Sequence, residues 1–248
     1  MAIDRYMEVS FAEEGVGSED HLAMRVFRQY GGRGGLKITS TIPPARGMGF
    51  SGAARVIGLA AAAVQQGQTL DECRRWLFLE STELEGHPDN VAASVFGGVT
   101  VAVGERVVRV PLGIQAQVVL WVPDSRSGTK ESRRKLPTAV PMEDAVFNLG
   151  RVSLLIAALA NGDVELLQEA TQDRLHQNAR LEQQPATANA MQAAVDAGAW
   201  CSWLSGSGPT AAALCEPAQA EAVAAALPEG GEVSISHIDM RGAVCERS

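Results

Sequence analysis

Positive charge is scarce in this chain: its 248 residues include 21 lysines and arginines against 29 acidic residues, a formal net charge of -8 at pH 7. Proteins that recognise nucleic acids or anionic membrane surfaces present basic patches. The acidic balance therefore argues against both kinds of partner and favours small soluble ligands.

Cysteine is also scarce, and the sequence has neither a Cys-x-x-Cys spacing nor nearby histidines that would complete a zinc site. We therefore expect free thiols in a reducing compartment. The first residues carry charges at Asp4, Arg5 and Glu8, unlike an apolar signal sequence or a membrane span. Together these features predict a cytoplasmic protein. The cysteines are Cys73, Cys201, Cys215 and Cys245.

Hydrophobic residues make up 46% of the chain and charged residues 20%, which suffices for one large or two modest cores. The apolar patterns change between the periods of strands and helices without the regular alternation of a parallel-sheet protein. They predict an α+β protein with helices on one side of mostly antiparallel sheets. We expect strands at residues 6–11, 36–42, 96–103, 107–112, 115–122, 200–204 and 211–215, and helices at residues 19–30, 53–65, 70–84, 146–160, 164–181, 188–197 and 218–226.

The segment from Ile42 to Ala54 is the most informative, because a strand end, a glycine loop and a helix start follow one another there. Glycines let the backbone approach an anion closely, and the N–H groups at a helix N-terminus add donors and the positive end of the dipole. The segment therefore predicts a phosphate-binding loop. The simple start of a buried alanine-rich helix is the alternative that the pattern leaves open.

Gly47, Gly49 and Gly52 also spell a G-x-G-x-x-G, but the rest of a dinucleotide site is missing. Pro43 and Pro44 break the preceding strand, and the acidic residues about 20 positions further on resemble a helix start rather than the end of a strand. No Gly-Lys-Ser/Thr of a Walker A loop follows, and the His-Arg-Asp and Asp-Phe-Gly segments of protein kinases are absent.

Two further segments are dense in polar or small residues. Residues 83–91, Glu-Leu-Glu-Gly-His-Pro-Asp-Asn-Val, could hold a hard cation, orient a substrate or transfer a proton. A helix cap and a turn explain these residues equally well. Residues 204–210, Leu-Ser-Gly-Ser-Gly-Pro-Thr, predict a hairpin turn whose function depends on what it contacts.

Residues 43–54, 85–91 and 204–210, in this order, resemble motifs of the GHMP kinase superfamily and, within it, of the homoserine kinases. Residues 127–137 and 173–180 resemble two linking stretches of the same family. Five motifs in the order of the family make coincidence a poor explanation.

The resemblance implies a GHMP kinase-like two-domain α+β fold, with an N-terminal part like domain 2 of ribosomal protein S5 and a ferredoxin-like C-terminal part. Residues 1–113 would form the ATP-binding domain and residues 114–248 the C-terminal domain. The implied reaction is the ATP-dependent phosphorylation of the hydroxyl of L-homoserine to O-phospho-L-homoserine, a step of threonine biosynthesis. GHMP kinases are often dimers, so a homodimer is one expected assembly.

The same resemblance assigns the ATP site. Ser51 and Glu85 would hold Mg²⁺, while backbone amides of the loop would hold the phosphates, because phosphoryl transfer depends on positioning and on neutralising charge. The loop residues that would contact ATP are Pro44, Ala45, Arg46, Gly47, Met48, Gly49, Phe50, Ser51, Gly52 and Ala53.

The resemblance also assigns the substrate site. Arg133 and Arg180 would bind the carboxylate of homoserine, a task that suits guanidinium groups. Thr129 would hydrogen-bond the reacting hydroxyl, and His87 and Asn90 would add contacts to the substrate. The residues expected to carry catalysis are Glu85, Thr129, Arg133 and Arg180.

The chain departs from the family pattern at two places. Phe50 stands where the family has a serine, and we expect it to pack on the domain and reshape the cradle. The first motif of the family has no counterpart, and residues 1–9 resemble the segment that follows that motif. We therefore expect Met1 to be an internal methionine of a longer reading frame, and weaker activity and lower stability without the motif.

Three other functions stay open. Another GHMP kinase, acting on a sugar or a mevalonate-like alcohol, would keep the glycine loop without needing Arg133 and Arg180. A catalytically impaired relative that binds a nucleotide or an amino acid would agree with Phe50. A nicotinamide oxidoreductase has the least support, because the acidic residue of its fingerprint is missing.

Overall fold

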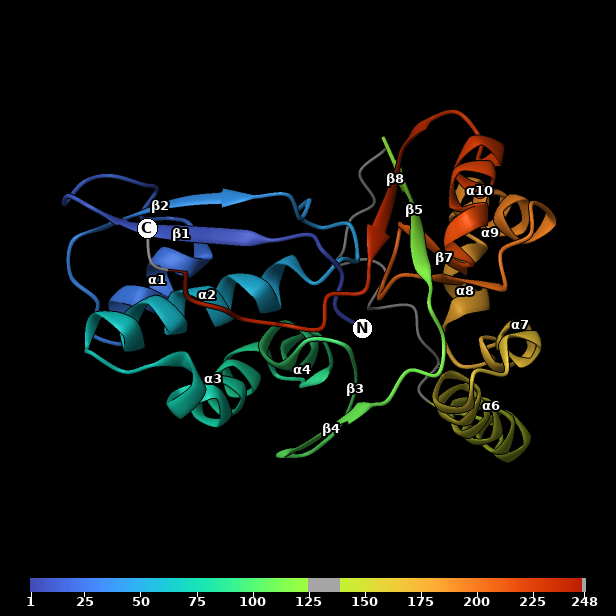
Figure 1. Cartoon of the computed structure of the whole chain (residues 1–248), viewed down its shortest axis with the longest axis horizontal. Coiled ribbons are helices and arrows are strands. Elements are labelled where there is room, and N and C mark those ends of the chain that lie inside the picture. The colour runs from blue at the N-terminus through green and yellow to red at the C-terminus, as the bar shows by residue number, and fades with distance from the viewer. Residues whose placement is uncertain (125–138, 247–248) are drawn as a thin grey trace. The chain divides into compact units, whose positions relative to one another are not determined.

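The computed structural model describes residues 1–124 and 139–246 (Figure 1). The chain forms two compact units: unit 1 combines Met1–Pro44, Gly49–Arg109 and Asp239–Ser248, and unit 2 combines Ala45–Met48 and Val110–Ile238. The glycine loop is therefore divided, because Ala45–Met48 group with unit 2, whereas Pro44 and the residues from Gly49 onward group with unit 1.

The helices and strands up to residue 110 are β1 (Met7–Ala12), α1 (Leu22–Gln29), β2 (Gly35–Ser40), α2 (Phe50–Gln65), α3 (Leu70–Glu85), α4 (Asp89–Phe96), β3 (Val99–Val103) and β4 (Arg106–Val110). Strands β1 and β2 pair antiparallel, and α1 and α2 pack against this two-stranded sheet (Figure 1). Phe27 of α1 and Leu36 of β2 are fully buried there. Gly58 of α2 lies directly on the backbone of α1, since a Cβ at this position would collide with the carbonyl oxygen of Ala23. The small residues of α2 thus allow a close approach of the two helices.

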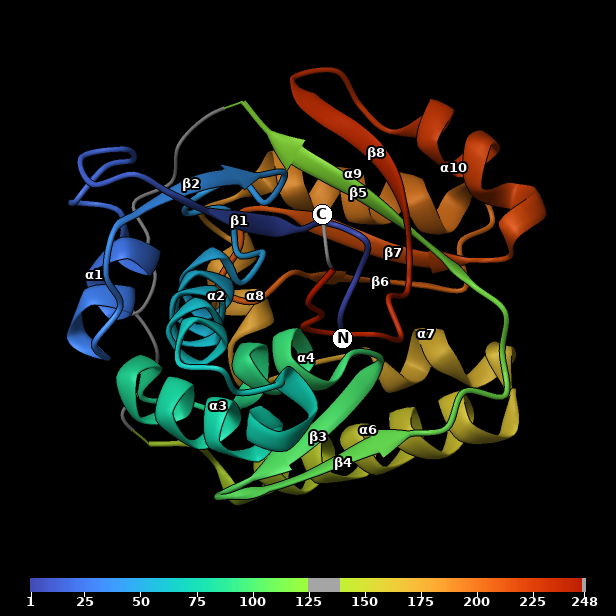
Figure 2. The same ribbon diagram turned by 60° about the vertical axis from the view of Figure 1, so that its left-hand side comes forward.

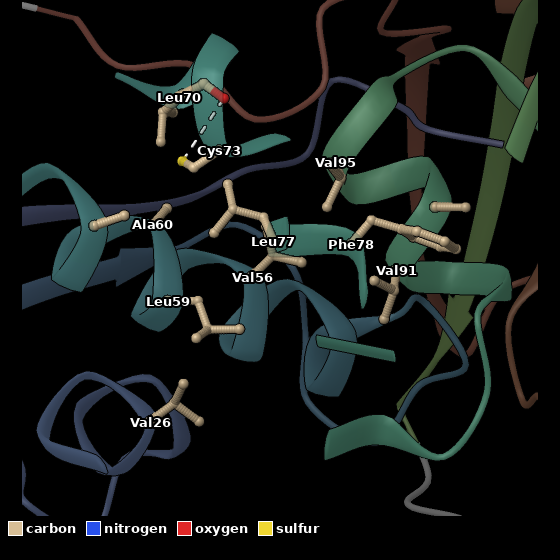
Figure 3. Close-up of a cluster of buried hydrophobic side chains, with 12 residues drawn as sticks. Val26, Val56, Leu59, Ala60, Leu70, Cys73, Leu77, Phe78, Val91 and Val95 are labelled. Carbon is tan, nitrogen blue, oxygen red and sulfur yellow. Dashed lines mark hydrogen bonds between the residues drawn. The ribbon is translucent and has the colours of Figure 1, made fainter. Parts of the chain in front are cut away.

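A cluster of buried side chains joins α2, α3 and α4 (Figure 3). Leu59, Leu77 and Val91 are 0% exposed, and Phe78 is 1% exposed. Burying a side chain of this size stabilises a protein by roughly 1.5–3 kcal/mol. This core fixes the end of α3 and the start of α4, which carry the polar residues of the sequence motif.

The ends of α3 follow from the sequence. The Thr69 hydroxyl accepts a hydrogen bond from the Glu72 N–H, and the Glu72 carboxylate accepts one from the Thr69 N–H, which is a capping box. Gly86 ends the helix with a φ of 85°, a conformation that favours glycine. The chain therefore turns immediately after Glu85 and enters α4 at Asp89.

The C-terminal segment returns to unit 1. The Gly98 N–H donates to the Asp239 carbonyl at 2.6 Å, and the Ala243 N–H donates to the Val95 carbonyl at 3.3 Å. Residues more than 140 positions apart in the sequence thus complete one unit.

The elements after residue 110 are β5 (Gln117–Pro123), α6 (Met142–Asn161), η1 (Val164–Leu166), α7 (Leu167–Ala170), α8 (Gln177–Leu181), α9 (Pro185–Asp196), β6 (Cys201–Leu204), β7 (Ala211–Cys215), η2 (Pro217–Gln219), α10 (Ala220–Ala226) and β8 (Gly231–His237). Four of them form an antiparallel sheet in the order β6-β7-β5-β8. Helices α9 and α10 cover one face of this sheet, where Val119 and Ala213 pack against Ala194 and Val223 (Figure 2). The expected pairing of residues 200–204 with 211–215 is confirmed. None of the described helices is long and apolar enough to cross a membrane.

The continuous helix predicted over residues 164–181 is wrong. Three short helical pieces stand there instead, and Asp173 lies in the non-helical stretch before α8. Its carboxylate accepts hydrogen bonds from the N–H groups of Leu175, His176 and Gln177, so it competes with helical bonding and starts a new helix. The strand predicted from residue 96 also begins later, because Phe96 ends α4. Neither α4 nor β8 was predicted.

Candidate active site

In unit 2, the glycine loop is held by the turn at residues 204–210. The Ser205 hydroxyl donates to the Gly47 carbonyl at 2.9 Å, and the Thr210 hydroxyl donates to the Arg46 carbonyl at 2.7 Å. Because the C=O and N–H of a planar trans peptide point in opposite directions, these bonds direct the N–H groups of Gly47 and Met48 away from the turn. The turn thus orients the loop amides that the sequence predicts for phosphate binding.

Gly47 makes this contact sterically feasible. Its φ is 74°, and a Cβ at this position would collide with the Ser205 carbonyl oxygen and lie 2.9 Å from that of Gly208. The neighbouring Arg46 donates from its guanidinium to the Asp124 carbonyl at 3.2 Å. The requirement for glycine here is therefore set by a segment more than 150 positions away.

In unit 1, the loop continues into the N-terminus of α2. Gly49 is the N-cap residue with a φ of 75°, and no described side chain caps the helix. The first N–H groups of α2 and the positive end of its dipole are therefore available to an anion. The side chain of Asn90 lies beside Gly49 and Gly52, since a Cβ on either glycine would come within 3.4 Å of it. Much of α2 beyond this end is buried and rich in alanine.

Phe50 packs sideways on unit 1. Its ring makes an edge-to-face contact with the ring of His21 at a centroid distance of 5.9 Å. The Nδ1 atom of His21 accepts a hydrogen bond from the Ala23 N–H and so caps α1. Burial lowers the pKa of His21, which favours the neutral ring that this cap requires. Phe50 is thus tied to the start of α1 as well as to the start of α2.

Glu85 is the most buried carboxylate at this end of unit 1, with a side chain that is 6% exposed. The Ser51 hydroxyl donates to its Oε2 atom at 2.7 Å. Arg55, one turn further along α2, donates from Nη1 to the same Oε2 atom and to the Ser51 hydroxyl. The two residues expected to hold a metal are thus joined to each other and to a guanidinium group.

His87 and Asp89 complete the polar cluster. Nδ1 of His87 lies 2.7 Å from Oδ1 of Asp89, and Nε2 lies 3.8 Å from Oε1 of Glu85. The same Asp89 oxygen accepts a hydrogen bond from the Asn90 N–H at the start of α4. The cluster is therefore a turn at a helix start, and it also gathers functional groups next to the glycine loop.

The arrangement of Ser51 and Glu85 does not fit a metal ion. Magnesium requires oxygen ligands that are free to coordinate it in an octahedral geometry, and here Arg55 hydrogen-bonds both predicted ligands. Within the described ranges, no cluster of three or more His, Cys, Asp or Glu side chains could hold a metal.

In unit 2, Arg180 lies on α8 next to the same turn that holds the loop. Its Nη1 atom donates to the Gly206 carbonyl at 3.1 Å and lies 3.2 Å from Nδ1 of His176. Gln177, on the same helix, accepts a hydrogen bond from the Leu204 N–H at 2.8 Å. Helix α8 is thus attached at two points to the 204–210 turn.

Asp173 sets the start of α8. Burial alone would raise the pKa of Asp173, but hydrogen bonds from the N–H groups of Gln177 and His176 and from the Asn148 side chain outweigh burial and lower it. Burial lowers the pKa of His176 despite the nearby Asp173. The ionised carboxylate of Asp173 and the neutral ring of His176 are therefore the favoured forms.

The structure thus gathers the predicted residues in two groups. Unit 1 holds Pro44, Gly49, Phe50, Ser51, Gly52, Ala53, Glu85, His87 and Asn90, and unit 2 holds Ala45, Arg46, Gly47, Met48 and Arg180. Thr129 and Arg133 lie outside the described residues.

Four polar residues of these groups were missed as site candidates: Arg55, Asp173, Ser205 and Thr210. For Arg55 a signal existed, because it is the single charged residue of α2 and follows Ser51 by four positions, which places both on one helix face. No signal within the sequence showed that Ser205 and Thr210 contact the glycine loop.

Models of known protein families match both parts of the chain. The GHMP kinases N terminal domain matches residues 20–98, and the GHMP kinases C terminal model matches residues 155–233. Together with the fold and the glycine loop, these matches make the chain a GHMP kinase.

Curated relatives narrow the assignment. The homoserine kinase of Desulfitobacterium hafniense is 42% identical over 196 residues, covering 77% of this chain and 65% of that protein. A homoserine kinase of Thermus thermophilus is 42% identical over 202 residues, covering 79% of this chain and 68% of that protein. The matched part thus spans about two thirds of these relatives. The chain belongs to the homoserine kinase family.

Solved structures agree with this assignment. The crystal structure of homoserine kinase from Cytophaga hutchinsonii has a TM-score of 0.78 at 25% identity, covering 95% of this chain and 86% of that one. The mevalonate kinase of L. major has a TM-score of 0.67 at 17% identity, covering 98% of this chain and 89% of that one, and shows the shared fold alone.

We predict that Asp173→Asn destabilises the protein by about 1–2 kcal/mol near neutral pH, because an amide oxygen accepts hydrogen bonds more weakly than the carboxylate that starts α8. The lowered pKa of Asp173 means that its contribution is present above the unfolded pKa of about 4 and is lost as pH falls through the folded value. Urea unfolding of both proteins between pH 7 and pH 3 should therefore show a stability difference that shrinks with acid.

Asp196→Asn is the matched control, because Asp196 is an exposed aspartate at the end of α9. Its effect should stay within about 0.5 kcal/mol. A difference for Asp173→Asn that is constant over the pH range would contradict the assigned role of the carboxylate.

Proposed function

We propose that this protein catalyses the ATP-dependent phosphorylation of the hydroxyl of L-homoserine to O-phospho-L-homoserine. Homoserine kinases from several bacteria are its relatives at 36–43% identity, and this relationship supports the substrate. The observation that carries the proposal is the attachment of the glycine loop to the 204–210 turn by Ser205 and Thr210, which turns successive loop amides toward one side.

The loop amides and the start of α2 are the groups proposed for the phosphates of ATP. Phosphoryl transfer requires little covalent chemistry from the protein, so catalysis consists of positioning and of stabilising negative charge. Backbone N–H groups fixed before the ligand arrives serve both purposes at no cost of reorganisation. In this proposal, residues 44–53 form the binding site for ATP.

Arg180 and Arg133 are proposed for the carboxylate of homoserine, with His87 and Asn90 as further contacts and Thr129 at the reacting hydroxyl. The bond from Arg180 to the Gly206 carbonyl restricts the guanidinium before the substrate binds. A restrained planar guanidinium suits a carboxylate because it pairs through two parallel hydrogen bonds. The catalytic roles of Thr129, Arg133 and Arg180 belong to this proposal. The role of Glu85, which the resemblance assigns to catalysis through Mg²⁺, depends on that metal ion.

The remaining proposals concern the metal ion, the pathway, the location and the assembly of the protein. We assign no step to Mg²⁺ at Ser51 and Glu85, since Arg55 bonds both side chains. A role in threonine biosynthesis follows if the product is O-phospho-L-homoserine. The cytoplasmic location, the homodimer and a domain boundary at residues 113 and 114 stay predictions.

The proposed reaction predicts release of ADP with homoserine and slow or no release with threonine, mevalonate or galactose. A coupled assay of ADP measures the rates, and phosphorus NMR identifies the product.

In the same assay, Arg180→Ala should lower kcat/KM for homoserine by about 10- to 100-fold, mainly through KM, because it removes charged hydrogen bonds to the carboxylate.

The KM for ATP should stay unchanged in Arg180→Ala, and Arg25→Ala, which changes an exposed arginine of α1, should behave like the parent. Faster turnover of mevalonate or galactose than of homoserine would replace the proposal with another GHMP kinase activity. Binding of both ligands without any ADP would indicate a non-catalytic relative.

Gly47→Ala should weaken the binding of ADP by at least about tenfold, because the new Cβ collides with the Ser205 carbonyl and displaces the loop. Gly67→Ala is a matched control: its φ of 85° imposes a similar backbone strain, but no atom lies within 4 Å of its Cβ position. Backbone strain should cost both variants about 1–2 kcal/mol of stability, and the collision should add a further loss in Gly47→Ala alone. Calorimetric titration with ADP separates the two effects, and equal affinities in both variants would count against the loop as the phosphate site.

A further inference from the structure

We propose that the pair Ser51 and Glu85 is a guanidinium site rather than a metal site, and that Arg55 is its resident cation. The inference deepens the proposed function, because it concerns the same loop and helix end, but its test needs neither ATP nor homoserine.

The geometry of Arg55 centres on one carboxylate oxygen. Nη1 of Arg55 donates to Oε2 of Glu85 and to the Ser51 hydroxyl, and it also lies 3.3 Å from the Ser51 carbonyl. The Ser51 hydroxyl donates in turn to the same Oε2 atom at 2.7 Å. The three side chains thus form a closed set of hydrogen bonds that joins Nη1 of Arg55, the Ser51 hydroxyl and Oε2 of Glu85.

Burial makes this pairing necessary. The side chain of Glu85 is 6% exposed and that of Arg55 is 19% exposed. A buried carboxylate is costly unless an opposite charge and hydrogen bonds compensate for the lost water. The guanidinium supplies both, so Glu85 needs no metal ion for compensation.

Arg55 and a divalent cation compete for the same oxygens. Coordinated Mg²⁺ lies about 2.0–2.1 Å from its oxygen ligands, whereas Arg55 already donates to Oε2 of Glu85 and to the Ser51 hydroxyl. Two cations at such short separation repel each other strongly where water is excluded. His87 faces the other carboxylate oxygen at 3.8 Å and adds no negative charge that would favour a second cation.

The position of Arg55 in the sequence supports a specific role. It is the single charged residue in a helix whose other residues are mostly alanine, glycine and apolar side chains. Its spacing of four residues from Ser51 places it on the face that meets the end of α3. The result is a guanidinium near the start of α2 whose charge is compensated by Glu85, so the pair adds no net charge at the positive end of the helix dipole.

The binding of Mn²⁺ to the ligand-free protein, measured by electron paramagnetic resonance, tests this assignment. The parent protein and Arg55→Lys should bind Mn²⁺ no more tightly than Glu85→Gln does. In the parent and in Arg55→Lys a side-chain cation blocks the carboxylate of Glu85, and in Glu85→Gln this carboxylate is absent. Arg55→Gln frees Glu85 and Ser51, so it should bind Mn²⁺ at least about tenfold more tightly than the parent. The double variant Arg55→Gln with Glu85→Gln should lose this gain.

Two results would overturn the proposal. One is a parent protein that binds Mn²⁺ at least about tenfold more tightly than Glu85→Gln, since Glu85 would then hold metal beside Arg55. The other is a folded Arg55→Gln variant without any gain. If Arg55→Gln does not fold, the Mn²⁺ affinities of the parent and of Arg55→Lys, compared with that of Glu85→Gln, still decide whether Glu85 holds metal beside Arg55. A chain that fails to phosphorylate homoserine but shows the expected pattern would refute the proposed function and leave this inference standing.

Discussion

The hydrogen bonds from Ser205 and Thr210 to the glycine loop are the contact on which the proposed phosphate site depends. A glycine loop alone is flexible, and flexibility weakens binding because each residue must be ordered when the ligand arrives. Here two hydroxyl groups fix the carbonyls of Gly47 and Arg46. Since each peptide is planar, fixing the carbonyl also fixes the N–H on the opposite side. The same turn binds α8 through Gln177, so the loop and the helix of Arg180 share one support within unit 2.

Unit 1 contains a buried negative charge, the carboxylate of Glu85, which must be compensated. The hydrophobic core of α2, α3 and α4 brings Glu85 to a position where water has little access. Arg55 and Ser51 compensate the charge from the facing helix. Because removing one member of a buried ion pair leaves an uncompensated charge, the group is a sensitive part of the unit. Phe50, which departs from the family pattern, is accommodated by its contact with His21 and leaves this group intact.

Local rules explain which elements were predictable. The helix over residues 70–84 was confirmed as α3 because its capping box and its C-terminal glycine act within one turn of chain. The helix over residues 164–181 was wrong because the carboxylate of Asp173 competes for backbone N–H groups, an effect that apolar periodicity does not reveal. Strand β8, which pairs with β5, was missed although Val233 and Ile235 alternate with polar residues, a short pattern that is typical of a strand. For the site, the glycine loop and its order relative to the other motifs were readable from sequence, while the partner of Glu85 was not.

The sequence by itself determined the order of the motifs, the family and the α+β class, because these depend on residue type and on spacing along the chain. Only the tertiary structure decided that residues 158 and 164 positions apart share hydrogen bonds in the glycine loop, and that Arg55 bonds both Ser51 and Glu85. The physical reason is that a hydrogen bond or an ion pair depends on distances of a few ångströms. Sequence patterns carry no such distances between segments that come together only when the core forms.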